Sequence, residues 1–224
     1  MGPHLPAEIR VGMGMSDDRI LAVDDSNLIA SGTRRKIYQH PEDENKILKI
    51  FWEDQMPARR RALLWYGRFK SLLRFDDNEN DYLQYRRAMK HAPRPLDGIY
   101  TIFGYAETTQ GRALVGEHVR NANGETSATL LSYLQDHGPS RIFPLVDGLF
   151  EELAAHHVVA RDPHLENILV RELESDALQL VIIDGLGDPN FIPLATISKT
   201  LNRKKLMRKK QTLIRKLNAF ATNG

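Results

Sequence analysis

The 224-residue sequence contains no cysteine, which excludes disulfide bonds and metal sites built from thiolates. It also has no apolar run approaching the roughly 20 residues that a membrane-spanning helix requires. Residues 1–19 lack the apolar core of a signal peptide, and their content of Gly, Pro and Met predicts a flexible tail. We therefore expect a cytoplasmic protein whose fold begins near residue 20.

Charge is distributed unevenly, although the formal net charge is only +2. Residues 55–75 contain six Lys or Arg and no acid, and residues 198–224 contain nine and no acid. Runs of this kind are most often the solvated face of an amphipathic helix. They also suit an anionic partner, so the basic C-terminal segment is a candidate surface for binding one.

Residues 20–119 carry the alternation and turn residues of a sheet-rich half. In the segment 46–52, Ile47, Lys49 and Phe51 fall on one face of a predicted strand. A lysine on such a face needs a buried partner or a ligand. The predicted strands are 20–23, 28–31, a return strand ending near residue 38, 46–52, 98–106 and 112–119, and the predicted helices are 53–75 and one beginning at 76–78.

Residues 120–224 have the longer period that is typical of helices. The polar link 119–125 separates this half from the sheet-rich half. Ser127 is the expected cap of its first helix. The predicted elements are a helix ending at residue 138, a helix ending near residue 157, a short strand at 168–170, a second strand ending at residue 184 and a helical segment over about 194–220. The fold class that follows is α+β.

Asp162 and Asn167 lie five residues apart on a predicted loop, and the hairpin that follows ends at Asp184. Groups at both ends of such a hairpin can hold a divalent metal ion and a hydroxyl nucleophile beside a phosphate. A zinc site made by the neighbouring histidines is a weaker alternative. Their spacing matches no usual ligand set, and a histidine at a helix C-terminus commonly interacts with the helix dipole. These histidines are His156, His157 and His164.

The segment around Asp162, VVARDPHLENILV, resembles the catalytic loop of protein kinase-like phosphotransferases, and the segment VIIDG resembles their metal-binding segment. More narrowly, the segments GTRRKIYQHPED and FIPLATISK and the basic tail resemble the YrbL family, small bacterial kinase-like proteins linked to the PhoP regulatory network. The resemblance implies a bilobal kinase-like fold. Its N-lobe, 20–119, would hold a five-stranded antiparallel sheet, and its C-lobe, 120–224, would be truncated and mainly helical.

The same resemblance assigns roles at the centre of the reaction. Asp162 would accept a proton from the attacking hydroxyl or orient it, and His164 would balance charge at the transferring phosphate, as in aminoglycoside-type phosphotransferases. Asn167 and Asp184 would bind Mg²⁺ that bridges the phosphates of ATP. Lys49 would pair with the α- and β-phosphates.

Other residues would bind the nucleotide. Gly32 would lie in the loop that covers the phosphates, and backbone groups of Glu117 and Val119 would meet adenine. Glu79 is the first choice for the helix acid that holds Lys49, and Asp81 is the second.

Several positions depart from the kinase-like pattern. Ala160 stands where the pattern has histidine, and Gly-Leu-Gly follows Asp184 in place of Phe-Gly. Only Gly32 remains of three loop glycines, with Arg34, Arg35 and Lys36 available to bind phosphate by charge. Only 40 residues follow Asp184, so we expect no platform for a peptide substrate.

Two functional hypotheses follow. The first is an ATP- and Mg²⁺-dependent phosphotransferase whose acceptor is a hydroxyl of a small molecule, anionic or sugar-like, rather than of a peptide. The alternative is a non-catalytic, nucleotide-binding kinase-like regulator whose basic helices bind an anionic partner.

Overall fold

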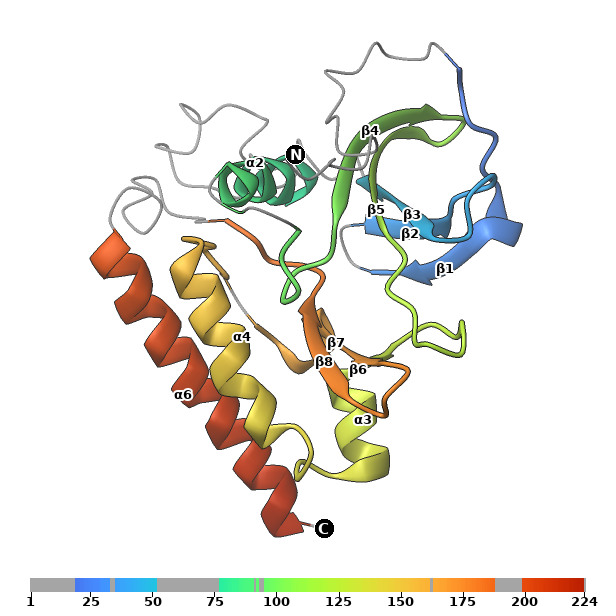
Figure 1. Cartoon of the computed structure of the whole chain (residues 1–224). Helices are drawn as coiled ribbons and strands as arrows, with labels where there is room; N and C mark the ends of the chain where they lie inside the picture. The colour runs from blue at the N-terminus through green and yellow to red at the C-terminus, as the bar shows by residue number, and fades with distance from the viewer. Residues whose placement is uncertain are drawn as a thin grey trace, which may run out of the picture.

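The computed structural model describes residues 19–32, 35–51, 77–90, 92, 95–161, 163–187 and 199–223. Within these ranges the chain forms a five-stranded sheet, a three-stranded sheet and four α-helices (Figure 1). This is the predicted α+β class. The predicted helix at 53–75, nearly all of the predicted tail, and Asp162 lie outside the described residues.

The first sheet is antiparallel, with the strand order β1-β2-β3-β5-β4. The prediction of a five-stranded antiparallel sheet is therefore confirmed. The predicted strand at 20–23 is wrong, because Leu21 makes only an isolated bridge to Thr108. The strands are β1 (Leu28–Ser31), β2 (Arg35–Gln39), β3 (Lys46–Phe51), β4 (Ile102–Thr108) and β5 (Gly111–Glu117).

Strand β3 is central, and this position determines the surroundings of Lys49. Lys49 pairs with Ile37 of β2 and with Leu114 of β5. Alternate residues of β3, including Leu48 and Ile50, pack into a hydrophobic cluster on one face of the sheet. Lys49 therefore points to the opposite face.

Helix α2 (Asp77–Met89) packs against β3 and β4. Its buried side begins with polar residues, Asn78 and Asp81, and ends with Tyr85 and Ala88. These positions follow the spacing of one helix face. The helix consequently brings polar groups to the sheet near Lys49 and apolar groups to the core beyond it.

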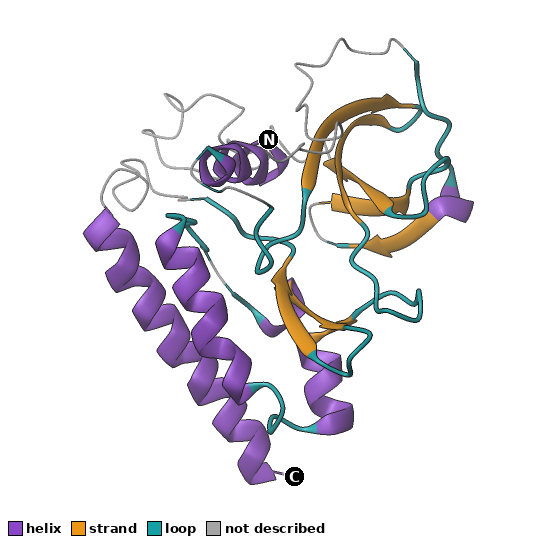
Figure 2. Ribbon diagram, viewed as in Figure 1, coloured by secondary structure: helices purple, strands orange, loops and turns teal. Residues whose placement is uncertain are grey.

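The described part of the second half contains three helices and a small antiparallel sheet (Figure 2). Thr129, not the predicted Ser127, caps its first helix, because the Thr129 hydroxyl accepts a 3.1 Å hydrogen bond from the backbone N–H of Ser132. Ser127 instead donates its hydroxyl to Asn121 at 2.8 Å. The elements are α3 (Leu130–His137), α4 (Phe143–Ala155), α6 (Lys199–Asn223), β6 (Ala128–Thr129), β7 (Ile168–Glu172) and β8 (Leu178–Ile182).

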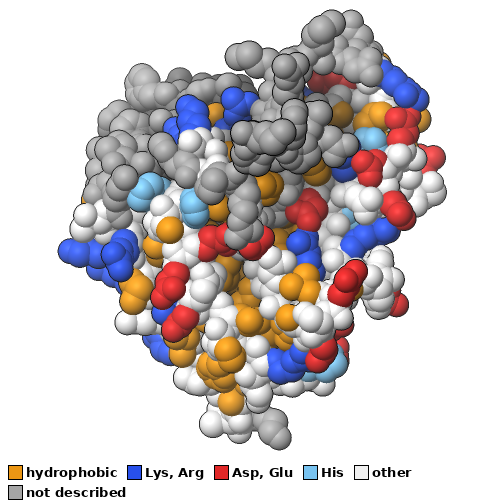
Figure 3. Space-filling model, in the orientation of Figure 1, with side chains coloured by type: hydrophobic (Ala, Val, Ile, Leu, Met, Phe, Trp, Pro, Cys, Tyr) orange, Lys and Arg blue, Asp and Glu red, His pale blue; other side chains and the backbone are white. Residues whose placement is uncertain are grey.

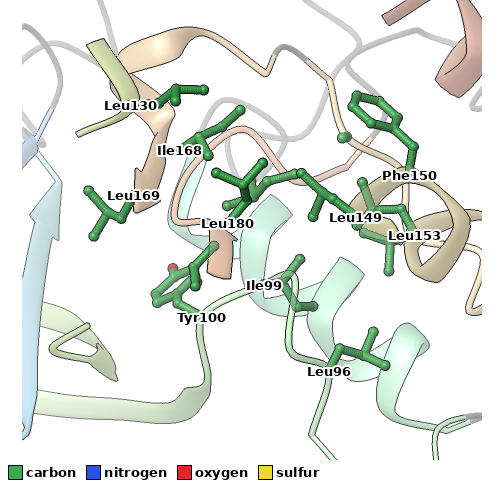
Figure 4. Packing of buried hydrophobic residues seen from close by; sticks show 14 of the residues in the cluster. Leu96, Ile99, Tyr100, Leu130, Leu149, Phe150, Leu153, Ile168, Leu169 and Leu180 are labelled. Atoms are coloured by element: carbon green, nitrogen blue, oxygen red, sulfur yellow. The ribbon is translucent and has the colours of Figure 1, made fainter. Parts of the chain in front are cut away.

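The larger hydrophobic cluster joins residues from both sides of residue 119 (Figure 4). Leu206, Leu213 and Leu217 of α6 are fully buried in it, and α6 lies along α4 (Figure 1). Strand β8 is almost wholly buried in the same cluster. Because β8 ends just before Asp184, the core fixes the position of that carboxylate. No described helix is both long and apolar enough to span a membrane.

Candidate active site

A cleft of about 1160 Å³ opens between the first strands of the five-stranded sheet and three parts of the second half, which are the beginning of α3, the turn before β7 and the residues after β8. Four residues that the sequence predicted for the site line it: Gly32, His164, Asn167 and Asp184. The other described lining residues are Ala30, Ser31, Arg35, Ile37, Asp77, Thr129, Leu131, Ser132, Gln135, Arg161, Glu166 and Gly185. Segments distant in sequence thus converge on one concave surface.

Lys49 is buried behind this cleft, with 1% of its surface exposed. Its ammonium donates a 2.5 Å hydrogen bond to the carbonyl oxygen of Ile183 and lies 4.0 Å from the centre of the Tyr100 ring. The buried partner expected from the strand pattern is therefore the carbonyl just before Asp184. Burial, together with the nearby Arg35 cation, lowers the pKa of Lys49 to about 8.

Asp81 is the acid of α2 that lies at this cluster. Its carboxylate accepts hydrogen bonds from the Arg35 guanidinium at 3.0 Å and from the backbone N–H of Leu186 at 2.9 Å. Burial raises the pKa of Asp81 to about 6, against the opposing effect of Arg35. The first choice from the sequence, Glu79, instead accepts a 2.9 Å hydrogen bond from the hydroxyl of Tyr105.

Arg35 connects three elements at the floor of the cleft. From β2 it donates to Asn78 at 2.8 Å and to Asp81 on α2, and it forms an ion pair with Asp184. Asn78 in turn donates to the carbonyl oxygen of Lys49 at 2.8 Å. The two carboxylates raise the pKa of Arg35 although its burial opposes this shift, so the guanidinium remains charged.

The segment Asp184–Gly187 is held mainly through its backbone. The carbonyl oxygen of Gly185 accepts a 2.7 Å hydrogen bond from the backbone N–H of Arg161, and the N–H of Gly187 donates to the carbonyl oxygen of Val159 at 2.8 Å. Gly185 and Gly187 have φ of 79° and 99°, values that favour glycine. Burial alone would raise the pKa of Asp184, but the charges of Arg35 and Lys49 lower it below its ordinary value. Asp184 is therefore ionised at neutral pH.

Asn167 ends a short 3₁₀ turn, Leu165–Asn167, that begins after His164. Its carbonyl oxygen accepts a 3.0 Å hydrogen bond from the N–H of Ile183, which ties the turn to the residue before Asp184. The amide and carboxylate oxygens of Asn167 and Asp184 are hard donors suited to Mg²⁺. Among the described residues, no group of three or more His, Cys, Asp or Glu could hold a metal ion.

Glu117 and Val119 are not brought to this cleft. Glu117 lines a separate cavity of about 340 Å³, and its carboxylate binds Arg171 and the backbone N–H of Thr101. Its own N–H donates to the carbonyl oxygen of Thr101 at 2.8 Å, while the carbonyl oxygen of Val119 accepts from Ser127 at 3.1 Å. Part of the backbone that was predicted to meet adenine is thus engaged within the protein.

Comparison with known proteins identifies related sequences. The model of a family described as PhoP regulatory network protein YrbL matches residues 21–218. Proteins described as uncharacterized protein YrbL, from Escherichia coli strain K12 and from Shigella flexneri, are each 23% identical over 187 residues. The aligned region covers 80% of this chain and 80% of each relative.

Proposed function

The chain belongs to the YrbL family of PhoP regulatory network proteins, and from that premise and the cleft around Asp184 we propose that it is an ATP- and Mg²⁺-dependent phosphotransferase of the protein kinase-like fold. Its acceptor is a hydroxyl of a small molecule. The observation that carries the proposal is that Asn167 and Asp184 line one cleft, while Lys49 is buried behind it and bonded to the residue before Asp184.

The cations at the floor of the cleft support binding of phosphates. Arg35 lines the cleft, and Lys49 lies behind it in a poorly solvated environment. Positive charges fixed in such an environment stabilise phosphate more strongly than charges in water do. Gly32, at the edge of the cleft, has room for close approach, because an added Cβ would meet, among the described residues, only the carbonyl oxygen of Arg35, at 3.6 Å. We assign the phosphates to this end of the cleft.

Asn167 and Asp184 would hold the Mg²⁺ ion. When bound, the metal would neutralise charge on the phosphates and align them with the attacking oxygen. Asp162, on the loop before Asn167, would orient the acceptor hydroxyl and accept its proton. This role of Asp162 is carried by the sequence motif alone.

The side of the cleft formed by α3 supports a small hydroxylated acceptor. It presents Thr129, Ser132 and Gln135, which are uncharged and can both donate and accept hydrogen bonds. Such a surface suits a sugar-like molecule better than a strongly charged peptide, because no ion pair is offered to a charged side chain on that side.

The proposal is tested by thermal melts of the wild type and of Asp184→Asn. Each protein is melted with ATP, with Mg²⁺ and with both. ATP and Mg²⁺ together should stabilise the wild type by about 2.7 kcal/mol when free ligand is about 100 times its Kd. Asp184→Asn should lose this effect of Mg²⁺. Asp136→Asn is the matched control, because it makes the same change at an exposed position of α3 and should respond like the wild type.

Turnover is the second measurement. Metal-dependent release of ADP, or autophosphorylation, should be present in the wild type and absent in Asp162→Ala. If the wild type shows neither nucleotide binding nor metal-dependent turnover, the proposed activity is refuted.

A second candidate function is a nucleotide-binding regulator that does no chemistry. The ion pair between Arg35 and Asp184 favours this second function, because it occupies a carboxylate that catalysis would need as a metal ligand. Helix α6 also exposes Arg203, Lys204 and Arg208, and Figure 3 shows basic side chains at the edge of the molecule where α6 begins. The family description, which names a regulatory network, agrees with this role. Its signature would be a nucleotide-induced shift in the melt without turnover.

A further inference from the structure

The contacts of Arg35 place a fixed positive charge at the candidate metal centre. Its side chain is 8% exposed, and its guanidinium reaches Asn78 at 2.8 Å and Asp81 at 3.0 Å. The same guanidinium forms an ion pair with the Oδ1 atom of Asp184. Because α2 and the segment after β8 both hold this group, it cannot move away from Asp184 without breaking contacts on two elements.

Asp184 offers only part of its carboxylate to a further cation. Its Oδ1 atom accepts from Arg35 and also from the backbone N–H of Gly185, at 2.5 Å. About a third of the side chain is still exposed, on the side of the cleft that Asn167 also lines. A divalent ion can therefore approach Asp184 from the cleft, but it would meet a carboxylate that is already paired and a second positive charge behind it.

We propose that Arg35 is a permanent cation of this centre. It shares Asp184 with the divalent metal ion and lowers the affinity for the metal when no nucleotide is bound. The inference rests on the proposed function, because it concerns the same Asp184. The physical reason is that like charges on one carboxylate repel each other, and the repulsion is strong where solvent is scarce. The triphosphate of a nucleotide offsets the surplus positive charge, so metal and nucleotide bind with positive coupling.

The test is a titration of the full chain with Mn²⁺ alone. The relaxation rate of water protons reports how much Mn²⁺ is bound. Coupling between charged sites commonly changes affinity about 5- to 150-fold, and we expect Arg35→Gln to bind Mn²⁺ about tenfold more tightly than the wild type. Arg35→Lys keeps the charge and should stay close to the wild type. Arg120→Gln is the matched control, because Arg120 is also partly buried in an ion pair, with Glu44, but lines the smaller cavity.

Arg35→Gln leaves the buried Asp81 without its cation and can prevent folding. The double variant Arg35→Gln/Asp81→Asn removes both charges and serves in its place, with the same expected gain. Adding Asp184→Asn to either variant should abolish the gain, because the shared carboxylate is then lost.

The outcomes separate the inference from the proposed function. Tighter Mn²⁺ binding in the Gln variants, reversed by Asp184→Asn, supports the inference. Equal Mn²⁺ affinity in the wild type and the Gln variants overturns the inference and leaves the proposed function standing. No Mn²⁺ binding in any variant, including when ATP is added, overturns both.

Discussion

Lys49→Met should make the protein more stable at neutral pH while removing its response to ATP. Lys49 is 1% exposed, and its pKa is about 8 in the fold against 10.5 for an ordinary lysine. The fold therefore disfavours the charged form by about 3 kcal/mol at neutral pH. Methionine has a similar length and carries no charge, so the substitution removes this unfavourable contribution.

The substitution also removes a favourable contact. The carbonyl oxygen of Ile183 loses the 2.5 Å hydrogen bond from Lys49, which costs about 1 kcal/mol. The expected net gain is about 2 kcal/mol in the free energy of unfolding. For a chain of this size, that gain corresponds to a rise of about 4–8 °C in Tm.

The gain should depend on pH in a defined direction. Between about pH 8 and pH 10.5, Lys49 is neutral in the folded wild type but still protonated in the unfolded chain. The unfolded state then binds the extra proton, so the stability of the wild type rises with pH through this window. Lys49→Met lacks this rise, and its advantage should shrink by about 2 kcal/mol between pH 7 and pH 9.5.

Urea unfolding of both proteins at the two pH values measures these changes. Lys46→Met is the control, because it removes a lysine from the same strand that is about one-third exposed and pairs with Asp43 at 2.8 Å. It should give no gain in stability, since an exposed pair contributes at most about 1 kcal/mol. A Lys49→Met protein that is less stable than the wild type at pH 7, or that keeps the same gain at pH 9.5, would refute the reasoning.

Three further predictions concern the neighbours of Lys49 and the basic helix. Arg35→Gln should lower the free energy of unfolding by about 3–5 kcal/mol, because it leaves the buried carboxylate of Asp81 without its cation. Arg35→Gln/Asp81→Asn should lose less, and urea unfolding that shows simple additivity of the two substitutions would argue against the pair. Gly32→Ala should leave Tm unchanged but weaken ATP binding in calorimetry, and unchanged affinity would remove Gly32 from the phosphate site. If α6 binds a polyanion, neutralising Lys204 and Arg208 should weaken the retention of the protein on heparin and reduce the salt dependence of that retention. Equal elution of the variant and the wild type would exclude this surface of α6 as the binding site.

The sequence predicted the strand that presents Lys49 because a short apolar run after a polar turn is a local signal of a buried strand. The run from Lys46 to Phe51 has the expected pattern, and the structure places β3 at the centre of the sheet. The need of Lys49 for a buried partner also followed from sequence. The identity of that partner did not, since the carbonyl of Ile183 lies 134 residues away and no local pattern reports it.

The sequence could not decide between Glu79 and Asp81, for a geometrical reason. Side chains two residues apart on a helix differ by about 200° in direction, so only one of the two acids can point toward Lys49 and Arg35. Which one does so depends on how α2 is rotated on β3 and β4, and the mixed polarity of this helix leaves that rotation ambiguous. Asn78 shares the buried face with Asp81, but the sequence alone does not report that burial.

The network around Arg35 could be anticipated only in part. A basic residue after Gly32 suggested phosphate binding by charge. Its pairing with Asp81 and Asp184 depends on contacts 46 residues away and beyond. Strand β6 was missed because two residues carry no periodic signal.

The hydrogen bond from the backbone of Leu186 to Asp81 has a consequence for how this site can vary between related proteins. The donor belongs to the main chain, so the link between α2 and the segment after β8 does not depend on which side chain stands at 186. Nearly any substitution there leaves the donor in place, and proline alone deletes it. A relative with another apolar side chain at this buried position can therefore keep the same mechanical connection, which a comparison of side chains would not detect.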